Sequence, residues 1–264
     1  MSLRKSINRG WRLAVTAVSF GAFGVGGLLL NLLVIPLIYF VPGDRPRLRH
    51  WTRWLIHKSF VLLLAWLKVT GTMRLEIRGA EDLCNRGGIL VLANHPTFID
   101  IVVLLSIIRD ADCVVKSQHW RNLAFGGAVR AAGYIPNDSA EILIEQCAEA
   151  IRRGGVLVIF PEGTRTRLAS HFHFQRGAAH IAIRSGADIQ PVILRCDPLT
   201  LSKNRKWYEI PERPFNFQME VKPVTPLTQW IPDREDSPLA ARHLTRSLEG
   251  FFMKEIYADR SLPA

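Results

Sequence analysis

A histidine and an aspartate lie five residues apart, directly after a short apolar run. The run Gly88–Ala93 has the composition of a β-strand and leads into Asn94, His95 and Pro96, with Asp100 shortly after. In open α/β sheets, ligands bind where strands end at their carboxyl edge. A turn at Pro96 would let Asp100 hydrogen-bond one imidazole nitrogen and raise the basicity of the other, as in a base that activates a hydroxyl. Taken alone, the pair also fits a helix-capping histidine and a first-turn acid favoured by the helix dipole.

A second polar stretch follows the apolar run Val156–Phe160 and contains Glu162, Gly163, Thr164 and Arg165. Gly163 permits a tight backbone, Glu162 can accept a hydrogen bond from a substrate hydroxyl, and Arg165 and Arg167 can hold an anionic oxygen group. An isolated stretch of this kind also fits a turn with solvated charges. Two strands that end at the same edge of a parallel sheet would bring both polar stretches to one cleft.

The segments around these stretches alternate between β-prone and helical runs. The alternation predicts an α/β fold with a mostly parallel sheet flanked by helices. The expected strands are Met73–Ile77, Gly88–Ala93, Cys113–Lys116, Val156–Phe160, Ile189–Leu194 and Phe215–Val221. The expected helices are Phe98–Ile108, His119–Ala132, Ser139–Arg153, Gln175–Ser185 and Leu239–Tyr257.

The N-terminal segment Leu13–Val41 carries no charged residue. About 20 apolar residues span a bilayer core as a helix, and the run is too long for the apolar region of a secretory signal. We therefore predict a retained anchor, with a re-entrant or surface-lying helix as the alternative because several glycines and Pro36 would loosen the helix. The segment Trp54–Val69 is short for a span and fits an interfacial helix. This divides the chain into a membrane-anchoring helical hairpin over residues 1–70 and an α/β domain over residues 71–264.

The composition is basic: 34 Lys and Arg against 23 Asp and Glu give a net charge of +11. Such an excess indicates an anionic partner, and the apolar N-terminus favours the membrane face over nucleic acid. Four widely spaced cysteines predict neither a zinc site nor a disulfide framework. The C-terminal basic residues Arg242, Arg246, Lys254 and Arg260 are expected on a solvated helix face. G-x-S-x-G, H-E-x-x-H and the phosphate-cradling G-x-x-x-x-G-K-[ST] motifs do not occur, so serine hydrolase, zinc peptidase and nucleotide hydrolase readings lack support.

Together the two polar stretches resemble the glycerolipid acyltransferase family, typified by the 1-acylglycerol-3-phosphate acyltransferases. The N-H-x-x-x-x-D signature of this family is met by Asn94, His95 and Asp100, and its F-P-E-G-T-R signature is met by residues 160–165. The resemblance covers about residues 70–225 and extends to Lys116 at a strand end and to the stretch Arg176-Gly177-Ala178. The N-terminal hairpin is also similar to the two-helix membrane element of the family.

The resemblance implies acyl transfer from acyl-CoA or acyl-carrier protein to a hydroxyl of a lysophospholipid such as 1-acylglycerol-3-phosphate, in phospholipid biosynthesis. His95 would be the general base and Asp100 the group that orients it. Amides at the start of the helix after Pro96, or Asn94, would stabilise the oxyanion. The apolar segment Ile101–Ile108 would form a wall of an acyl groove, with ordinary core packing as the alternative. The substrate-binding residues would be Asn94, Lys116, Glu162, Gly163, Thr164 and Arg165. Beyond the thioester co-substrate, neither a cofactor nor a metal is expected. The implied location is the inner membrane, with the catalytic domain on the cytoplasmic side.

One departure from the family pattern concerns the acceptor. The family carries G-x-x-F-I-x-R between its two signatures, and the matching run Gly133–Ser139 has Ser139 where the phosphate-binding arginine is expected. An amino-acid lipid or a polyene lipid therefore stays open as the acceptor. A non-catalytic membrane adaptor that binds lipids is the alternative from a different class of protein.

Overall fold

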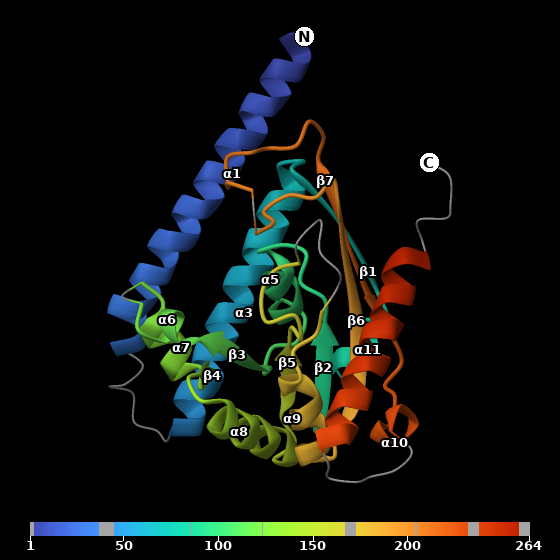
Figure 1. The fold of residues 1–264 in the computed structure, drawn as a ribbon. Helices are drawn as coiled ribbons and strands as arrows, with labels where there is room; N and C mark the ends of the chain where they lie inside the picture. The colour runs from blue at the N-terminus through green and yellow to red at the C-terminus, as the bar shows by residue number, and fades with distance from the viewer. Residues whose placement is uncertain are drawn as a thin grey trace.

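The computed structural model describes residues 3–36, 45–84, 86–122, 124–166, 173–203, 205–231 and 238–258 (Figure 1). Seven strands form one sheet in the order β1-β7-β6-β2-β5-β3-β4. Only the β6–β7 pair is antiparallel, and the remaining neighbours run parallel. The predicted α/β fold with a mostly parallel sheet is confirmed. The strands are β1 (Met73–Arg78), β2 (Ile89–Ala93), β3 (Asp112–Lys116), β4 (Ile135–Asn137), β5 (Val156–Ile159), β6 (Asp188–Asp197) and β7 (Phe215–Val221).

Strand β2 lies at the centre of the sheet, and all five of its residues are buried. Its side chains alternate between two apolar cores, as the pleat requires: Ile89, Val91 and Ala93 join one core, and Leu90 and Leu92 join the other. The first core is covered by α3 (Arg45–Val69) and α5 (Asp100–Leu105), and the second by α8 (Ala140–Arg152), α9 (Gly177–Ser185) and α11 (Pro238–Ala258). Both faces of the sheet are therefore closed, and its edges remain for ligands. The short helices α4 (Glu81–Cys84), α6 (Ser117–Trp120), α7 (Gly126–Ala131) and α10 (Leu227–Trp230) connect these elements.

The N-terminal helix α1 (Leu3–Leu29) runs diagonally across the molecule and continues into a π-helical turn, η1 (Leu30–Val34) (Figure 1). The turn ends just before Pro36, where we expected the helix to loosen. Within the described residues, one helical stretch, Ser6–Leu33, is long and apolar enough to cross a membrane, with a mean hydropathy of 2.0. This helix is the segment for which we predicted a membrane anchor, with a re-entrant or surface-lying helix as the alternative.

Helix α3 begins at Arg45 rather than at Trp54, because its first turns also pack against the rest of the protein. Arg53 donates hydrogen bonds to the carbonyls of Ala132 and Asp110. Further along, Leu64 and Leu67 join the first apolar core. The segment that we expected at the membrane interface therefore also covers the sheet, and the domain boundary at residue 70 remains a prediction. Residues 37–44, which would close the hairpin, lie outside the described residues.

The sequence did not predict strand β4, which lies at the edge of the sheet beside β3. Its central residue Pro136 has no backbone N–H to donate, so the position is compatible only with an edge strand. The helix expected over residues 119–132 is divided into α6 and α7. The break occurs at Asn122, whose side-chain oxygen accepts from the backbone N–H of Ala124 and Phe125.

Candidate active site

The side chains of His95 and Asp100 are in direct contact just beyond the carboxyl end of β2. The Nδ1 atom of His95 lies 2.7 Å from Oδ2 of Asp100, whose side chain is fully buried. The ring of His95 stacks on Phe160, with centroids 4.0 Å apart and an interplanar angle of 16°. The His95 side chain is 19% exposed. Because Nδ1 points to the carboxylate, Nε2 lies on the opposite side of the ring and is left for a substrate.

The carboxylate of Asp100 is held in place by Thr97. Its Oδ2 accepts the backbone N–H of Thr97 at 2.8 Å, and Oδ1 accepts the Thr97 hydroxyl. A threonine followed three residues later by an acid that bonds back to its N–H is the arrangement of a capping box. Burial raises the pKa of Asp100, while the hydrogen bonds from His95 and Thr97 oppose the rise. The carboxylate is thus fixed before any substrate arrives.

Glu162 ties the second polar stretch to the first. Its Oε1 accepts the backbone N–H of His95 at 2.8 Å and the hydroxyl of Thr166 at 2.9 Å. The backbone N–H of Thr166 in turn donates to the carbonyl of His95 at 2.7 Å. Burial raises the pKa of Glu162, and the hydrogen bonds from His95 and Thr166 oppose the rise. The two predicted motifs therefore do meet at one edge of the sheet, and Glu162 is part of the link between them.

Asn94 is turned away from this cleft. Its Nδ2 donates to the carbonyl of Leu194 and its Oδ1 accepts the N–H of Leu194, both at 2.7 Å. The side chain thus fastens the end of β2 to β6 and is buried. This geometry favours a positioning role for Asn94 over the predicted contact with substrate.

The remainder of the Glu-Gly-Thr-Arg turn is more open. Gly163 is exposed and has a φ of 66°, a conformation that favours glycine, and its N–H donates to the carbonyl of Phe160 at 3.0 Å. Thr164 and Arg165 are half-buried. The Nη1 atom of Arg165 lies 2.9 Å from the carbonyl oxygen of Leu201. Arg165 therefore holds the segment that follows β6 over the site.

Several amides that we expected to stabilise an oxyanion already have partners. The N–H of Thr97 donates to Asp100, and the N–H of Phe98 donates to the carbonyl of Leu201 at 3.1 Å. The amide of Asn94 is paired with Leu194. None of these three groups is therefore free to receive developing negative charge in this conformation.

Lys116 and Ser139 lie at the ends of strands further along the sheet. Lys116 is exposed at the end of β3, which is separated from β2 by β5. Among the described residues, no hydrogen bond or ion pair joins Lys116 to His95 or to the Glu-Gly-Thr-Arg turn. Ser139 is exposed and begins α8, and the neighbouring Asp138 accepts the hydroxyl of Ser117.

An apolar groove is lined in part by residues that follow His95 closely in the chain. It is bounded by α1, by α3 and by the chain that follows His95, where Phe98 and Ile99 reach its wall. From the predicted wall segment Ile101–Ile108 only Val102 lines the groove, because the other buried side chains of α5 face the core of the sheet. The remaining lining residues are Thr16, Ser19, Phe20, Phe23, Leu63, Leu67, Thr72, Leu201 and Phe215.

Sequence reasoning did not predict the contacts that four residues make at the site: Thr97, Phe160 (the ring that stacks on His95), Thr166 and Leu201. The T-x-x-D spacing of Thr97 and Asp100 is a readable capping signal. The other three act through contacts between distant segments, which the sequence does not reveal. Arg167, which was also expected to hold an anion, lies outside the described residues.

Comparisons with known proteins agree with the motifs. Residues 74–195 match the family model described as Acyltransferase. The mouse 1-acyl-sn-glycerol-3-phosphate acyltransferase alpha is 26% identical over 212 residues, which are 76% of this chain and 71% of that protein. The 1-acyl-sn-glycerol-3-phosphate acyltransferase of Pseudomonas aeruginosa is 25% identical over 170 residues, 62% of each chain. In fold, the chain is similar to the crystal structure of the 1-acyl-sn-glycerophosphate acyltransferase PlsC from Thermotoga maritima, with a TM-score of 0.70, 16% identity and coverage of 98% and 100% of the two chains.

Proposed function

We propose that this acyltransferase, which belongs to the glycerolipid acyltransferase family, moves a fatty acyl group from a thioester to a hydroxyl of a lyso-lipid. The proposed reaction is that of a 1-acylglycerol-3-phosphate acyltransferase. One observation carries the proposal. The imidazole of His95, steadied by Asp100, lies in the same cleft as the Glu-Gly-Thr-Arg turn, and Phe98 and Ile99, shortly after His95 in the chain, line an apolar groove. A base, an acceptor site and a place for an acyl chain are thus adjacent.

In the proposed reaction Nε2 of His95 removes the proton of the acceptor hydroxyl while its oxygen attacks the thioester carbonyl. The tetrahedral intermediate then expels the thiolate, which takes the proton from the imidazolium. Asp100 holds the neutral tautomer with the proton on Nδ1 and stabilises the imidazolium that forms. General-base assistance of this kind contributes about 10²–10⁴-fold to the rate. The step requires no covalent enzyme intermediate.

The acyl chain would lie in the apolar groove between α1 and α3. Phe98 and Ile99 reach the groove wall and follow His95 by only a few residues, so a thioester at the imidazole could place its chain there. Residues Phe20 and Phe23 of α1 also line the groove, which brings the apolar N-terminal helix to the acyl site. This arrangement supports membrane association, with donor and acceptor drawn from the cytoplasmic side of the inner membrane.

The acceptor would bind at the Glu-Gly-Thr-Arg turn. Gly163 leaves space at the turn, and Arg165 supplies its positive charge. An acceptor without a phosphate, such as a lyso form of an amino-acid lipid, is the second candidate. Its specific support is Ser139, an exposed serine beside Asp138 where the family pattern has an arginine.

The test is a transfer assay with the full chain in phospholipid vesicles. Acyl-CoA or acyl-carrier protein is offered with 1-acylglycerol-3-phosphate, a zwitterionic lysophospholipid or a lyso amino-acid lipid, and products are identified by mass spectrometry. We expect a diacyl product that forms only when an acceptor is present. Release of free fatty acid without an acceptor would indicate a hydrolase instead, and an absence of any product would favour the lipid-binding adaptor.

A further inference from the structure

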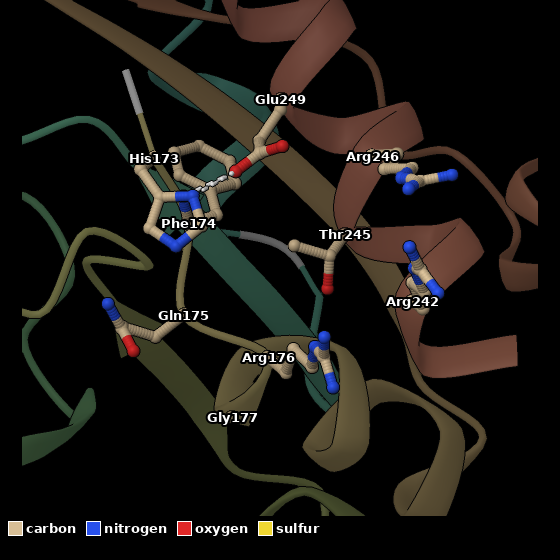
Figure 2. Close-up of a pocket in the computed structure, with 9 residues that line it drawn as sticks. All are labelled: His173, Phe174, Gln175, Arg176, Gly177, Arg242, Thr245, Arg246 and Glu249. Atoms are coloured by element: carbon tan, nitrogen blue, oxygen red, sulfur yellow. Dashed lines mark hydrogen bonds and ion pairs between the residues drawn. The ribbon is translucent and has the colours of Figure 1, made fainter. Parts of the chain in front are cut away.

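A second hollow lies on the other face of the sheet, between α11 and the chain that leads into α9 (Figure 2). It has a volume of about 530 Å³, within the range of small-molecule sites. Figure 2 shows that its walls carry three arginines, with Arg176 on one side and Arg242 and Arg246 on α11 on the other. Thr245 lies between them.

The three guanidinium groups are exposed, and no carboxylate among the described residues forms an ion pair with them. The acid that lines the hollow, Glu249, already has two partners in its wall: its Oε1 accepts the N–H of Phe174 at 2.6 Å and lies 3.2 Å from Nδ1 of His173. Like charges that face a common space repel one another unless an anion lies between them. The hollow therefore has the charge of an anion site.

Backbone groups add to this charge. Arg176 immediately precedes α9, whose first amides point out of the helix without partners in it and give that end a partial positive charge. Arg242 and Arg246 are four residues apart and so project from the same face of α11. Two helices and three guanidinium groups thus converge on one space, and Arg is the side chain that best matches phosphate oxygens.

The hollow is close to the reacting groups. The N–H of Gln175, which lines it, donates to the carbonyl of Pro161 at 2.7 Å. A Cβ on Gly163 would come within 3.4 Å of Cγ of Gln175. Pro161 is followed directly by Glu162, which accepts the N–H of His95. The turn that begins at Pro161 therefore connects the wall of the hollow to His95.

We propose that this hollow binds the phosphate groups at the nucleotide end of an acyl-CoA donor. The inference rests on the acyl transfer proposed above and names its donor. Coenzyme A carries a diphosphate and a separate phosphate on the ribose, joined to the thioester by a long flexible arm. A concave space with three arginines suits such a ligand, whereas the convex acidic surface of a carrier protein would need an exposed flat patch.

The variants Arg242→Gln and Arg246→Gln, singly and together, test the proposal in the full chain. Lys254→Gln is the matched control, because Lys254 is exposed on the same helix and does not line the hollow. Two donors are compared: acyl-CoA and acyl-pantetheine, which has the same thioester and lacks the nucleotide. We expect each arginine variant to raise the KM for acyl-CoA about tenfold, with kcat and the KM for acyl-pantetheine unchanged.

Binding of adenosine 3′,5′-bisphosphate gives a readout that does not depend on turnover. Wild type and Lys254→Gln should bind it and be inhibited competitively against acyl-CoA, and the double arginine variant should bind about 100-fold more weakly. Equal losses with both donors, no change with acyl-CoA, or a loss confined to acyl-carrier protein would overturn the proposal while leaving acyl transfer intact. If the wild type transferred acyl groups from no thioester, the proposed function itself would fail.

Discussion

The backbone N–H of His95 donates to Oε1 of Glu162 at 2.8 Å, although the two residues are 67 positions apart in the chain. This bond joins the two polar stretches within three residues of the ends of β2 and β5. It also explains why a carboxylate is placed at position 162: a buried acceptor is needed for an N–H that no strand or helix satisfies. We therefore interpret Glu162 first as a positioning residue, with its contact to an acceptor as a proposal.

Replacement of His95 by alanine removes the proposed base. We expect the rate of acyl transfer to fall by about 10²–10⁴-fold, because the acceptor hydroxyl would have to lose its proton to water. Single-turnover assays with purified protein in vesicles measure the loss. His243→Ala is the control, since His243 is exposed on α11 and outside the cleft. Unchanged transfer by His95→Ala, with circular dichroism like that of wild type, would refute the assignment.

Replacement of Asp100 by asparagine keeps the size of the side chain and removes its charge. The amide cannot stabilise an imidazolium, and its NH₂ group competes with the Nδ1–H of His95 for the same position. We expect kcat to fall at least about 100-fold while the KM for the acceptor changes little. Steady-state kinetics distinguish this from a binding defect. A raised KM with a normal kcat would show that Asp100 acts on substrate binding instead.

The pKa of Glu162 predicts a dependence of stability on pH. Burial raises this pKa, so the folded protein binds the proton more tightly than the unfolded chain does. The contribution is fully present below the ordinary carboxyl pKa and is lost as the pH rises through the raised value. Glu162→Gln removes this contribution and keeps an acceptor oxygen for His95.

Thermal unfolding of Glu162→Gln and wild type across acidic to neutral pH measures the difference. We expect the melting temperature of the variant, relative to wild type, to increase as the pH rises through the raised pKa. A difference that stays constant with pH, or one that decreases, would contradict the prediction.

The central strand and the contact between His95 and Asp100 could be predicted because both are local. Five consecutive apolar residues indicate a strand buried on both faces, and a five-residue spacing lets two side chains meet across one turn. The pairing of Asn94 with Leu194 could not be predicted, since it joins positions 100 residues apart. The parallel order of the strands decides such contacts, and no local pattern encodes it.

Helix α11 shows the same limit. Its amphipathic pattern placed Arg242 and Arg246 on an exposed face, and both side chains are exposed. What the pattern could not show is that α9 packs beside this helix and brings Arg176 into the same space. A charge on a helix face becomes part of a site only through its tertiary neighbour.

The apolar groove predicts control of acyl chain length. Leu63→Trp would add a large side chain to the groove wall and shorten the space for an acyl chain, so we expect preference to shift to shorter donors. Leu62→Trp is the matched control, because the adjacent Leu62 is 72% exposed and does not line the groove. Competition among saturated donors of increasing length measures the profile. An identical profile for Leu63→Trp and wild type would place the acyl chain elsewhere.

Arg165 gives the last prediction, because its guanidinium already holds the carbonyls of Leu201 at 2.9 Å and Ser202 at 3.3 Å. Lysine has one ammonium group in place of the planar fork, so Arg165→Lys should release the segment that follows β6. Leu201 also accepts the N–H of Phe98 beside the imidazole, and its displacement would reshape both the acyl and acceptor sites. We expect kcat/KM to fall about tenfold for phosphorylated and zwitterionic acceptors alike, with faster amide exchange in the released segment. A loss confined to acceptors that end in a phosphate, with normal amide exchange, would instead show that Arg165 binds the acceptor directly and that its hold on Leu201 is incidental.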